Sequence, residues 1–222
     1  MTLPNHTPPY HHGDLRQCFI DTACAHLRAS SADQLSLRAL AREIGVSQTA
    51  PYRHFENKNA LFAAIATHGF ELMTADLQAA AALHDDDIAQ TVADVGFEYV
   101  QWALRNPEKY QLFFDSSLLD FSDYPGLQAA GANCFEVLVG LIRAGIEQQV
   151  FVDESAELLA GTIWASVHGL TSLLQTNIRD ASTERTSETV SKAIQALVEQ
   201  QRSVLRMFVN SIRRPSLAMS SL

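Results

Sequence analysis

Apolar residues recur at helical spacing along almost the whole chain. Leu37, Leu40, Ala41 and Ile44 stand at positions i, i+3, i+4 and i+7, which places them on one face of a short helix. No stretch shows the sustained two-residue alternation of a strand, and no hairpin dipeptide joins β-branched runs. The pattern therefore predicts an all-α fold.

The same periodicity divides the chain into segments. Residues 1–12, which contain Pro4, Pro8 and Pro9, are expected to form a flexible arm. Pro107 and Pro125 mark two helix starts, because proline is tolerated in the first helical turn. Helices are predicted over 14–29, over 35–55 as a short pair, and over 57–82, 88–105, 107–118, 125–149, 153–178 and 187–212. The run Asp85–Asp87 lacks a calcium-loop pattern and predicts a solvated helix start.

The short pair over 35–55 has the pattern of a helix-turn-helix. Ser36 stands where an N-cap belongs, and Gly45 follows the apolar stripe where a helix end favours a residue that tolerates positive φ. Ser47 is placed to cap the second helix, which Phe55 would anchor. Short polar side chains at the start of a second helix are typical of major-groove recognition. An ordinary helical hairpin remains the alternative.

Charge is distributed unevenly along the chain. The net charge is -9, from 16 Lys+Arg and 25 Asp+Glu. The first 60 residues carry six Lys+Arg and five Asp+Glu, a net +1, so the remainder has 10 against 20, a net -10. DNA affinity depends on local neutralisation of phosphates, so this N-terminal segment can bind DNA while the acidic remainder is held away.

Other sequence features exclude several classes of protein. There is no nucleophile elbow, no HExxH motif and no phosphate-binding glycine loop, which argues against an enzyme. No cofactor or metal is expected, since Cys18, Cys24 and Cys134 lack metal-ligand spacing. These cysteines are expected to be reduced thiols, either buried and inert or redox-sensing. Without a long apolar run or a signal peptide, we expect a cytoplasmic protein that does not span a membrane.

Four segments resemble the tetracycline-repressor (TetR) family of bacterial transcriptional regulators. They are Tyr10–Arg16, Ala50–Phe62, Trp102–Phe114 and Trp164–Leu170. The last resembles the Trp…His-Gly (WHG) element of one branch of the family. The resemblance implies an all-α homodimer with a helix-turn-helix head at 13–60 and a larger body at 61–222 that dimerises and binds a small-molecule effector. Effector binding would release a palindromic operator; the alternative is a helical scaffold protein that does not bind DNA.

The candidate DNA contacts fall into two groups. Hydrogen bonds to phosphates position a protein, whereas contacts with base edges specify sequence. Gln48 and Thr49 are candidates for adenine and thymine edges, and Arg53 for guanine or only phosphate. The candidate phosphate contacts are Ser36, Arg38, Tyr52, His54 and Lys58. Lys58 opposes the dipole of its helix, which favours a phosphate clamp over a lysine extended into solvent.

Candidate residues for the body are apolar and aromatic. An effector pocket, for a largely apolar molecule, is predicted from Phe97, Trp102, Tyr110, Phe113, Phe114, Phe135, Trp164 and His168. Each of these residues is alternatively ordinary core. The last two long helices are expected to form a four-helix dimer interface. Its predicted residues are Leu170, Leu174, Ile194, Leu197, Gln201, Val204 and Phe208, with a purely intramolecular core as the alternative.

Overall fold

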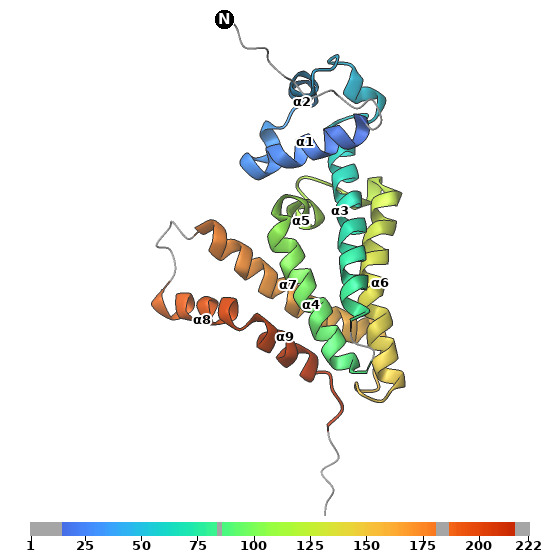
Figure 1. The fold of residues 1–222 in the computed structure, drawn as a ribbon, viewed down its shortest axis with the longest axis vertical. Coiled ribbons are helices and arrows are strands. Elements are labelled where there is room, and N and C mark those ends of the chain that lie inside the picture. The colour runs from blue at the N-terminus through green and yellow to red at the C-terminus, as the bar shows by residue number, and fades with distance from the viewer. Residues whose placement is uncertain (1–14, 84–85, 181–186, 216–222) are drawn as a thin grey trace, which may run out of the picture.

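The computed structural model describes residues 15–83, 86–180 and 187–215, with the side chains of 177–180 left out. The predicted arm at 1–12, and with it His11 and His12, lies outside these ranges. Within them the chain is helical and has no strand beyond one isolated bridge, so the all-α prediction is confirmed. A small head stands at one end of a larger helical body, and α3 runs from one into the other (Figure 1).

The head consists of α1 (Leu15–Ala29), a 3-10 turn η1 (Ala32–Gln34), α2 (Leu37–Ile44) and a second 3-10 turn η2 (Ala50–Arg53). The predicted stripe of α2 faces inward, with Leu37, Leu40 and Ala41 buried. Gly45 ends α2 with a φ of 81°, the left-handed conformation that glycine adopts at little cost. The first helix and the turn of the motif therefore form as the sequence predicts.

The segment after the turn differs from the prediction. A second α-helix was expected, but the chain forms only a turn and η2. Pro51 has no N–H to donate to the Ser47 carbonyl, and proline disfavours helical backbone in the preceding residue. The Ala50 N–H bonds instead to the Ser47 oxygen at 2.9 Å, a three-residue spacing. Buried Pro51 and Phe55 hold this segment against the head.

Helix α3 (Lys58–Ala81) belongs to both parts of the molecule. The side chain of Asn57 caps it by accepting from the Ala60 N–H at 2.9 Å. Its first turns bury Leu61, Phe62 and Ile65, while Met73 and Leu77 are buried further along. The predicted boundary between residues 60 and 61 falls inside this continuous helix, so head and body share α3.

The body is built from α4 (Ile88–Arg105), α5 (Pro107–Phe114), α6 (Pro125–Glu147) and α7 (Ala156–Asp180), with a 3-10 turn η3 (Phe121–Asp123). Asp87 begins α4 by accepting from the backbone N–H groups of Ala89 and Gln90, both at 3.1 Å. This part of the predicted acidic helix start is observed; Asp85 lies outside the described residues. Helix α5 ends at Phe114, four residues before its predicted end.

Helix α6 is long and apolar enough to span a membrane by length and composition. No membrane span was expected, because the sequence shows no long apolar run. In the structure α6 packs against α3, α4 and α7. Leu127, Val139 and Ile142 are buried in these contacts.

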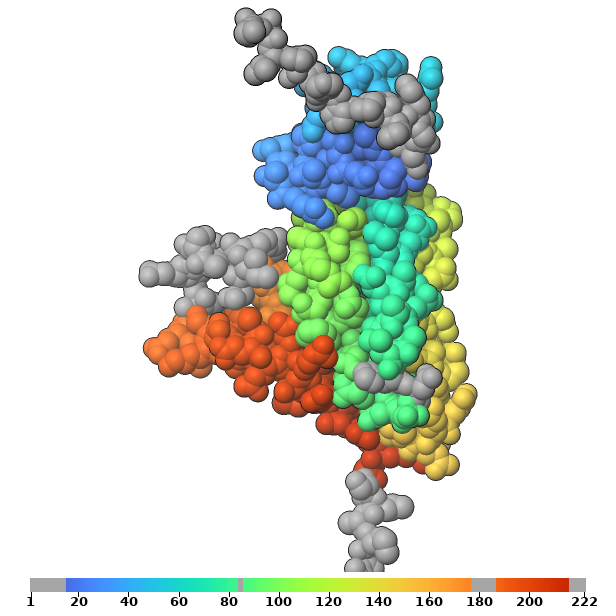
Figure 2. Space-filling view, in the orientation of Figure 1, coloured from blue at the N-terminus to red at the C-terminus, as the bar shows by residue number. Residues whose placement is uncertain are grey.

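The last predicted helix, over 187–212, is two helices. α8 (Glu188–Glu199) and α9 (Gln201–Asn210) are separated at Gln200, which has a φ of -118°. The guanidinium of Arg202 lies 3.8 Å from the Phe97 ring centroid, and its Nη1 is 2.7 Å from Asp94 on α4. α9 thus packs on α4, whereas α8 buries no residue and lies beside α7, to one side of the body (Figure 2).

Candidate DNA-binding surface and ligand cavity

The predicted base-reading residues lie on the outer surface of the head. Gln48 and Thr49 are exposed on the turn after Gly45, and Arg53 is exposed at the end of η2. The Thr49 hydroxyl lies 3.2 Å from the Ser47 hydroxyl. The structure therefore brings these three polar side chains to one short segment that the buried Pro51 and Phe55 anchor.

Four of the predicted phosphate contacts are exposed on the same head. Ser36 precedes α2 in extended backbone, and its side chain makes no capping bond to the helix. Arg38 is exposed in the first turn of α2, and Tyr52 is 48% exposed on η2. The His54 ring contacts Phe19 and Phe55, with centroids 6.4 and 6.3 Å away, and remains exposed at its edge. These hydroxyl, guanidinium and imidazole groups can all donate to phosphate oxygens.

Lys58 is the first residue of α3, as predicted, but its ammonium has a partner within the head. Nζ donates to the Ala32 carbonyl oxygen at 3.3 Å and lies 5.7 Å from the Phe62 ring centroid. A carbonyl and an aromatic face thus offset part of the unfavourable interaction with the helix dipole. The Lys58 side chain is half-buried, so both the phosphate clamp and the alternative of a lysine reaching toward solvent stay predictions.

The body contains a partly open cavity of about 300 Å³. Four of the predicted pocket residues line it: Phe113, Phe114, Phe135 and Trp164. Sequence reasoning missed the contribution of α3, whose Phe70, Met73 and Leu77 also line the cavity. Other residues of its wall come from α4, η3, α6 and α7, namely Val92, Val95, Gly96, Tyr99, Phe121, Gly131, Cys134, Leu138, Ile163 and Val167. This lining suits a largely apolar molecule.

A small polar cluster adjoins the cavity. The Tyr110 hydroxyl lies 2.7 Å from His168 Nδ1 and 3.1 Å from the Tyr99 hydroxyl. Burial raises the pKa of Tyr110 to about 12 and lowers the pKa of His168 below its usual value. Both groups are therefore neutral near pH 7, so the cluster offers hydrogen bonds without a charge.

Four predicted pocket residues lie outside the cavity wall: Tyr110 and His168 of the polar cluster, and Trp102 and Phe97. Trp102 is 1% exposed and stacks on Phe113 with centroids 5.6 Å apart, so it supports the wall from behind. Phe97 faces α9 and contacts Arg202 instead. Both residues lie on α4, and Phe97 sits on a face of that helix that points away from the cavity. The interpretation as ordinary core describes Trp102.

The predicted dimer residues divide by location. Leu170 and Leu174 on α7 are 3% and 2% exposed, because they pack into the chain's own core. The other predicted dimer residues lie on α8 and α9 and are half-buried: Ile194, Leu197, Gln201, Val204 and Phe208. Other apolar side chains of α7 and α8 are exposed, namely Leu158, Leu173, Val190 and Val198. Exposed apolar side chains at this density often mark an interface.

The fold and the exposed turn define a helix-turn-helix protein with a ligand-sized cavity in its body. Residues 19–65 match the family profile described as bacterial regulatory proteins, tetR family. Residues 92–197 match a tetracyclin repressor-like C-terminal domain. The chain belongs to the tetR family of transcriptional regulators, and the resemblance noted in the sequence is confirmed at the level of the family. No curated protein sequence gives a significant match.

Solved structures share this architecture. A protein of unknown function from Rhodococcus sp. RHA1 is 26% identical, with a TM-score of 0.74, covering 93% of this chain and 99% of that one. The fatty acid degradation regulator FadR from Bacillus halodurans is 13% identical, with a TM-score of 0.66 over 88% and 96%. The regulator PfmR from Thermus thermophilus is 17% identical, with a TM-score of 0.57 over 69% and 84%. The latter two likenesses concern the fold alone.

Proposed function

We propose that this regulator is a repressor that binds a palindromic operator as a homodimer and is released by a largely apolar small molecule. The observation that carries the proposal is the path of α3. This helix begins in the head at Lys58 and lines the cavity in the body with Phe70, Met73 and Leu77. A ligand that displaces these side chains acts on the same helix that positions the DNA-binding surface.

Recognition of DNA is assigned to the exposed segment after Gly45. Gln48 and Thr49 are assigned to adenine and thymine edges, and Arg53 to a guanine edge or a phosphate. Since Pro51 and Phe55 are buried, the segment is held rigidly enough to present these side chains together. Two such heads in a dimer would contact half-sites about 34–36 Å apart.

Phosphate contacts are assigned to Ser36, Arg38, Tyr52, His54 and Lys58. Lys58 would exchange the carbonyl of Ala32 for a phosphate oxygen, a change that gains a charge-assisted hydrogen bond. The start of α3 adds backbone N–H groups to the same place. These contacts supply affinity on any sequence, whereas the segment after Gly45 supplies specificity.

The effector is assigned to the cavity between α3, α4, α5, α6 and α7. Its apolar wall would bury the hydrocarbon part of a ligand, and the hydroxyl of Tyr99, which also bonds with the Tyr110 hydroxyl, would accept or donate a hydrogen bond at one side. A ligand of this kind is a small molecule with few polar groups. Trp164 lines the cavity, and the His168 ring lies 5.7 Å from it between centroids.

The dimer is assigned to the outward faces of α7 and α8. Leu173, Val190 and Val198 supply the exposed apolar area, flanked by the half-buried Ile194 and Leu197. This replaces Leu170 and Leu174 of the predicted interface by side chains of the opposite face of α7. Two such helix pairs form a four-helix contact of the predicted kind. The protein would act in the cytosol, as a regulator without catalytic activity or a bound cofactor.

A gel shift on the promoter beside its own gene tests the proposal. We expect sequence-preferring binding at moderate salt, with a complex of two chains per operator. Binding should weaken when an apolar ligand of the cavity is added. The helical scaffold that the sequence left as an alternative would show no preference for any DNA fragment.

A further inference from the structure

A second hollow, of about 700 Å³, lies where the head meets the body. We call it the junction cleft. α1 contributes Leu27 and Arg28, α5 contributes Glu108, and the segment after α5 contributes Asp115. α7 closes the cleft with His168 and Gln175. The cleft is therefore bounded by both parts of the molecule, whereas the cavity described above is lined by residues of the body.

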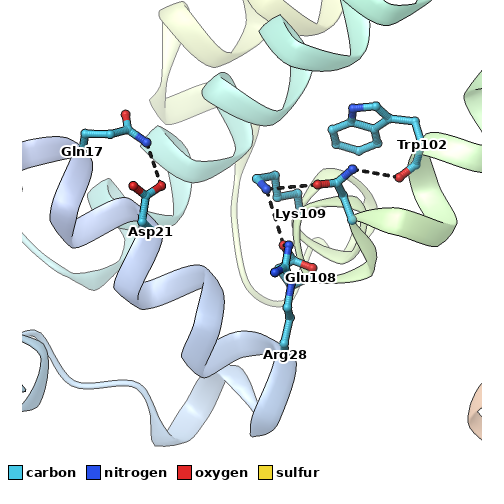
Figure 3. Close-up of polar contacts among 7 residues, drawn as sticks. Gln17, Asp21, Arg28, Trp102, Glu108 and Lys109 are labelled. Atoms are coloured by element: carbon cyan, nitrogen blue, oxygen red, sulfur yellow. Dashed lines mark hydrogen bonds and ion pairs between the residues drawn. The ribbon is translucent and has the colours of Figure 1, made fainter.

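Glu108 is a buried carboxylate with only one of its oxygens in use. Its side chain has no exposed surface, and Oε1 lies 2.8 Å from Arg28 Nη2 and 3.4 Å from Lys109 Nζ. Oε2 is buried and has no hydrogen-bond partner among the described residues. Figure 3 shows the Arg28 side chain reaching from α1 to this carboxylate, with Lys109 beside it. A buried carboxylate oxygen without a donor is costly, so this one is poised to accept a hydrogen bond.

The remaining lining of the cleft is also rich in acceptors. Asp115 is a second carboxylate, and its hydrogen bonds with Ser117 hold its pKa below the usual value. The Gln175 amide nitrogen donates to the Ala103 carbonyl at 3.1 Å, which leaves the amide oxygen as an acceptor. Arg28 also lines the cleft, and its guanidinium already forms an ion pair with Glu108. The hydroxyl and amide groups of the lining can donate as well as accept, so the two carboxylates select the ligand, and they favour one that brings donors with positive charge.

Arg28 covers the carboxylate without being fixed there. Its side chain is 53% exposed, whereas that of Glu108 is fully buried. A long, half-exposed side chain can turn into solvent, and the cost of leaving the buried carboxylate with Lys109 alone is offset when another cation takes its place. Leu27, Leu104 and Phe114 add apolar surface to the same cleft. A cation with a short hydrocarbon part can therefore replace the guanidinium and also give Oε2 a donor.

We propose that the junction cleft binds an organic cation whose ammonium group replaces Arg28 on Glu108, while its hydrocarbon part lies against Leu27, Leu104 and Phe114. The Arg28–Glu108 pair joins α1 of the head to α5 of the body, so an occupied cleft loses this polar contact between them. Binding of the cation needs no DNA, so it can be tested separately from the proposed function. If the cation does not bind, the proposals for the operator and the effector cavity still stand, and if the protein does not bind an operator, the proposal for the junction cleft still stands.

Isothermal titration of the full chain with n-octylammonium chloride tests the site, with n-octanol as the uncharged probe for apolar binding alone. We expect octylammonium to bind the wild-type protein more tightly than octanol. Glu108→Gln should weaken octylammonium binding about tenfold or more and leave octanol binding unchanged, because a charge-assisted bond is lost. Arg28→Met should instead tighten octylammonium binding severalfold, because the competitor is gone. Glu154→Gln, at an exposed acid outside the cleft, is the matched control and should change neither.

The opposite signs expected for Glu108→Gln and Arg28→Met separate a binding site from a merely structural ion pair. If Arg28→Met binds octylammonium no better than the wild type, the proposal is wrong, whether or not Glu108→Gln folds. Equal affinity of the wild type and a folded Glu108→Gln variant also overturns it. So does equal binding of octanol and octylammonium by the wild-type protein.

Discussion

Replacing Lys58 by methionine tests how the head holds the DNA backbone. Methionine keeps an apolar stem beside Phe62 and removes the ammonium group. Folding should change little. Losing one hydrogen bond to the Ala32 carbonyl costs about 1 kcal/mol, and removing a cation from a helix start returns about 0.3–1 kcal/mol. The urea midpoint of the variant should therefore stay close to that of the wild type.

The effect on DNA binding should be large and independent of sequence. Each phosphate contact contributes about 0.9 to the slope of log affinity against log salt, and a dimer has two copies of Lys58, so the slope should become shallower by about 1.8. When salt rises from 50 to 200 mM, both affinities should fall. The factor by which the wild-type affinity falls should be about twelve times the factor for the variant.

Fluorescence anisotropy of a labelled operator fragment, titrated at several KCl concentrations, measures this slope. Arg143→Met is the matched control, since it removes a cation that pairs with Glu136 and Glu157 on the body. Its slope should equal that of the wild type. A Lys58→Met slope that also equals the wild-type slope would show that the ammonium stays on Ala32 and does not contact phosphate.

Three further predictions follow from the body. A Cβ at Gly145 would lie 2.3 Å from the buried Phe151 ring, so Gly145→Ala should lower the free energy of unfolding by about 1–3 kcal/mol in urea titrations. Gly140→Ala on the same helix meets nothing within 4 Å and should instead raise it by about 0.5–1 kcal/mol; equal effects would contradict the close approach. Burial lowers the pKa of His168, so as the pH drops the unfolded chain binds a proton at this histidine before the folded chain does. The stability of the fold should therefore decrease as the pH drops below about 6.5. Thermal melts should show a weaker pH dependence for His168→Gln. Leu173→Glu should give monomers by sedimentation, while Leu72→Glu, at a similarly exposed leucine, should stay dimeric; a dimeric Leu173→Glu would contradict the assigned interface.

The head was predictable because its signals are local. Leu37, Leu40 and Ala41 share one helical face, and Gly45 is needed where the backbone turns left-handed. The segment around Pro51 was harder to predict, because an exposed, polar 3-10 turn and the first turn of an α-helix have similar sequences. The missing N–H of proline decided between them.

Which apolar residues of the body line the cavity depends on tertiary contacts, and the spacing of residues in the sequence does not reveal those contacts. Phe113, Phe114, Phe135 and Trp164 line the cavity, whereas Trp102 lies behind Phe113. An aromatic residue in a wall and one in the layer behind it are equally apolar and equally periodic. The same limit explains α7, where Leu170 and Leu174 of the predicted interface are buried in the chain's own core and Leu173 is exposed. Periodicity shows that a helix has an apolar face, but tertiary packing decides what covers it.

Footprinting of the purified protein on genomic DNA fragments tests the central claim most directly. The account predicts protection of a palindromic sequence at moderate salt, on two half-sites about one helical turn or a small multiple of it apart. It also predicts that Gln48→Ala relaxes the preferred sequence while keeping the affinity for unrelated fragments. Uniform protection without a preferred sequence, or a preference unaffected by Gln48→Ala and Thr49→Ala together, would contradict it.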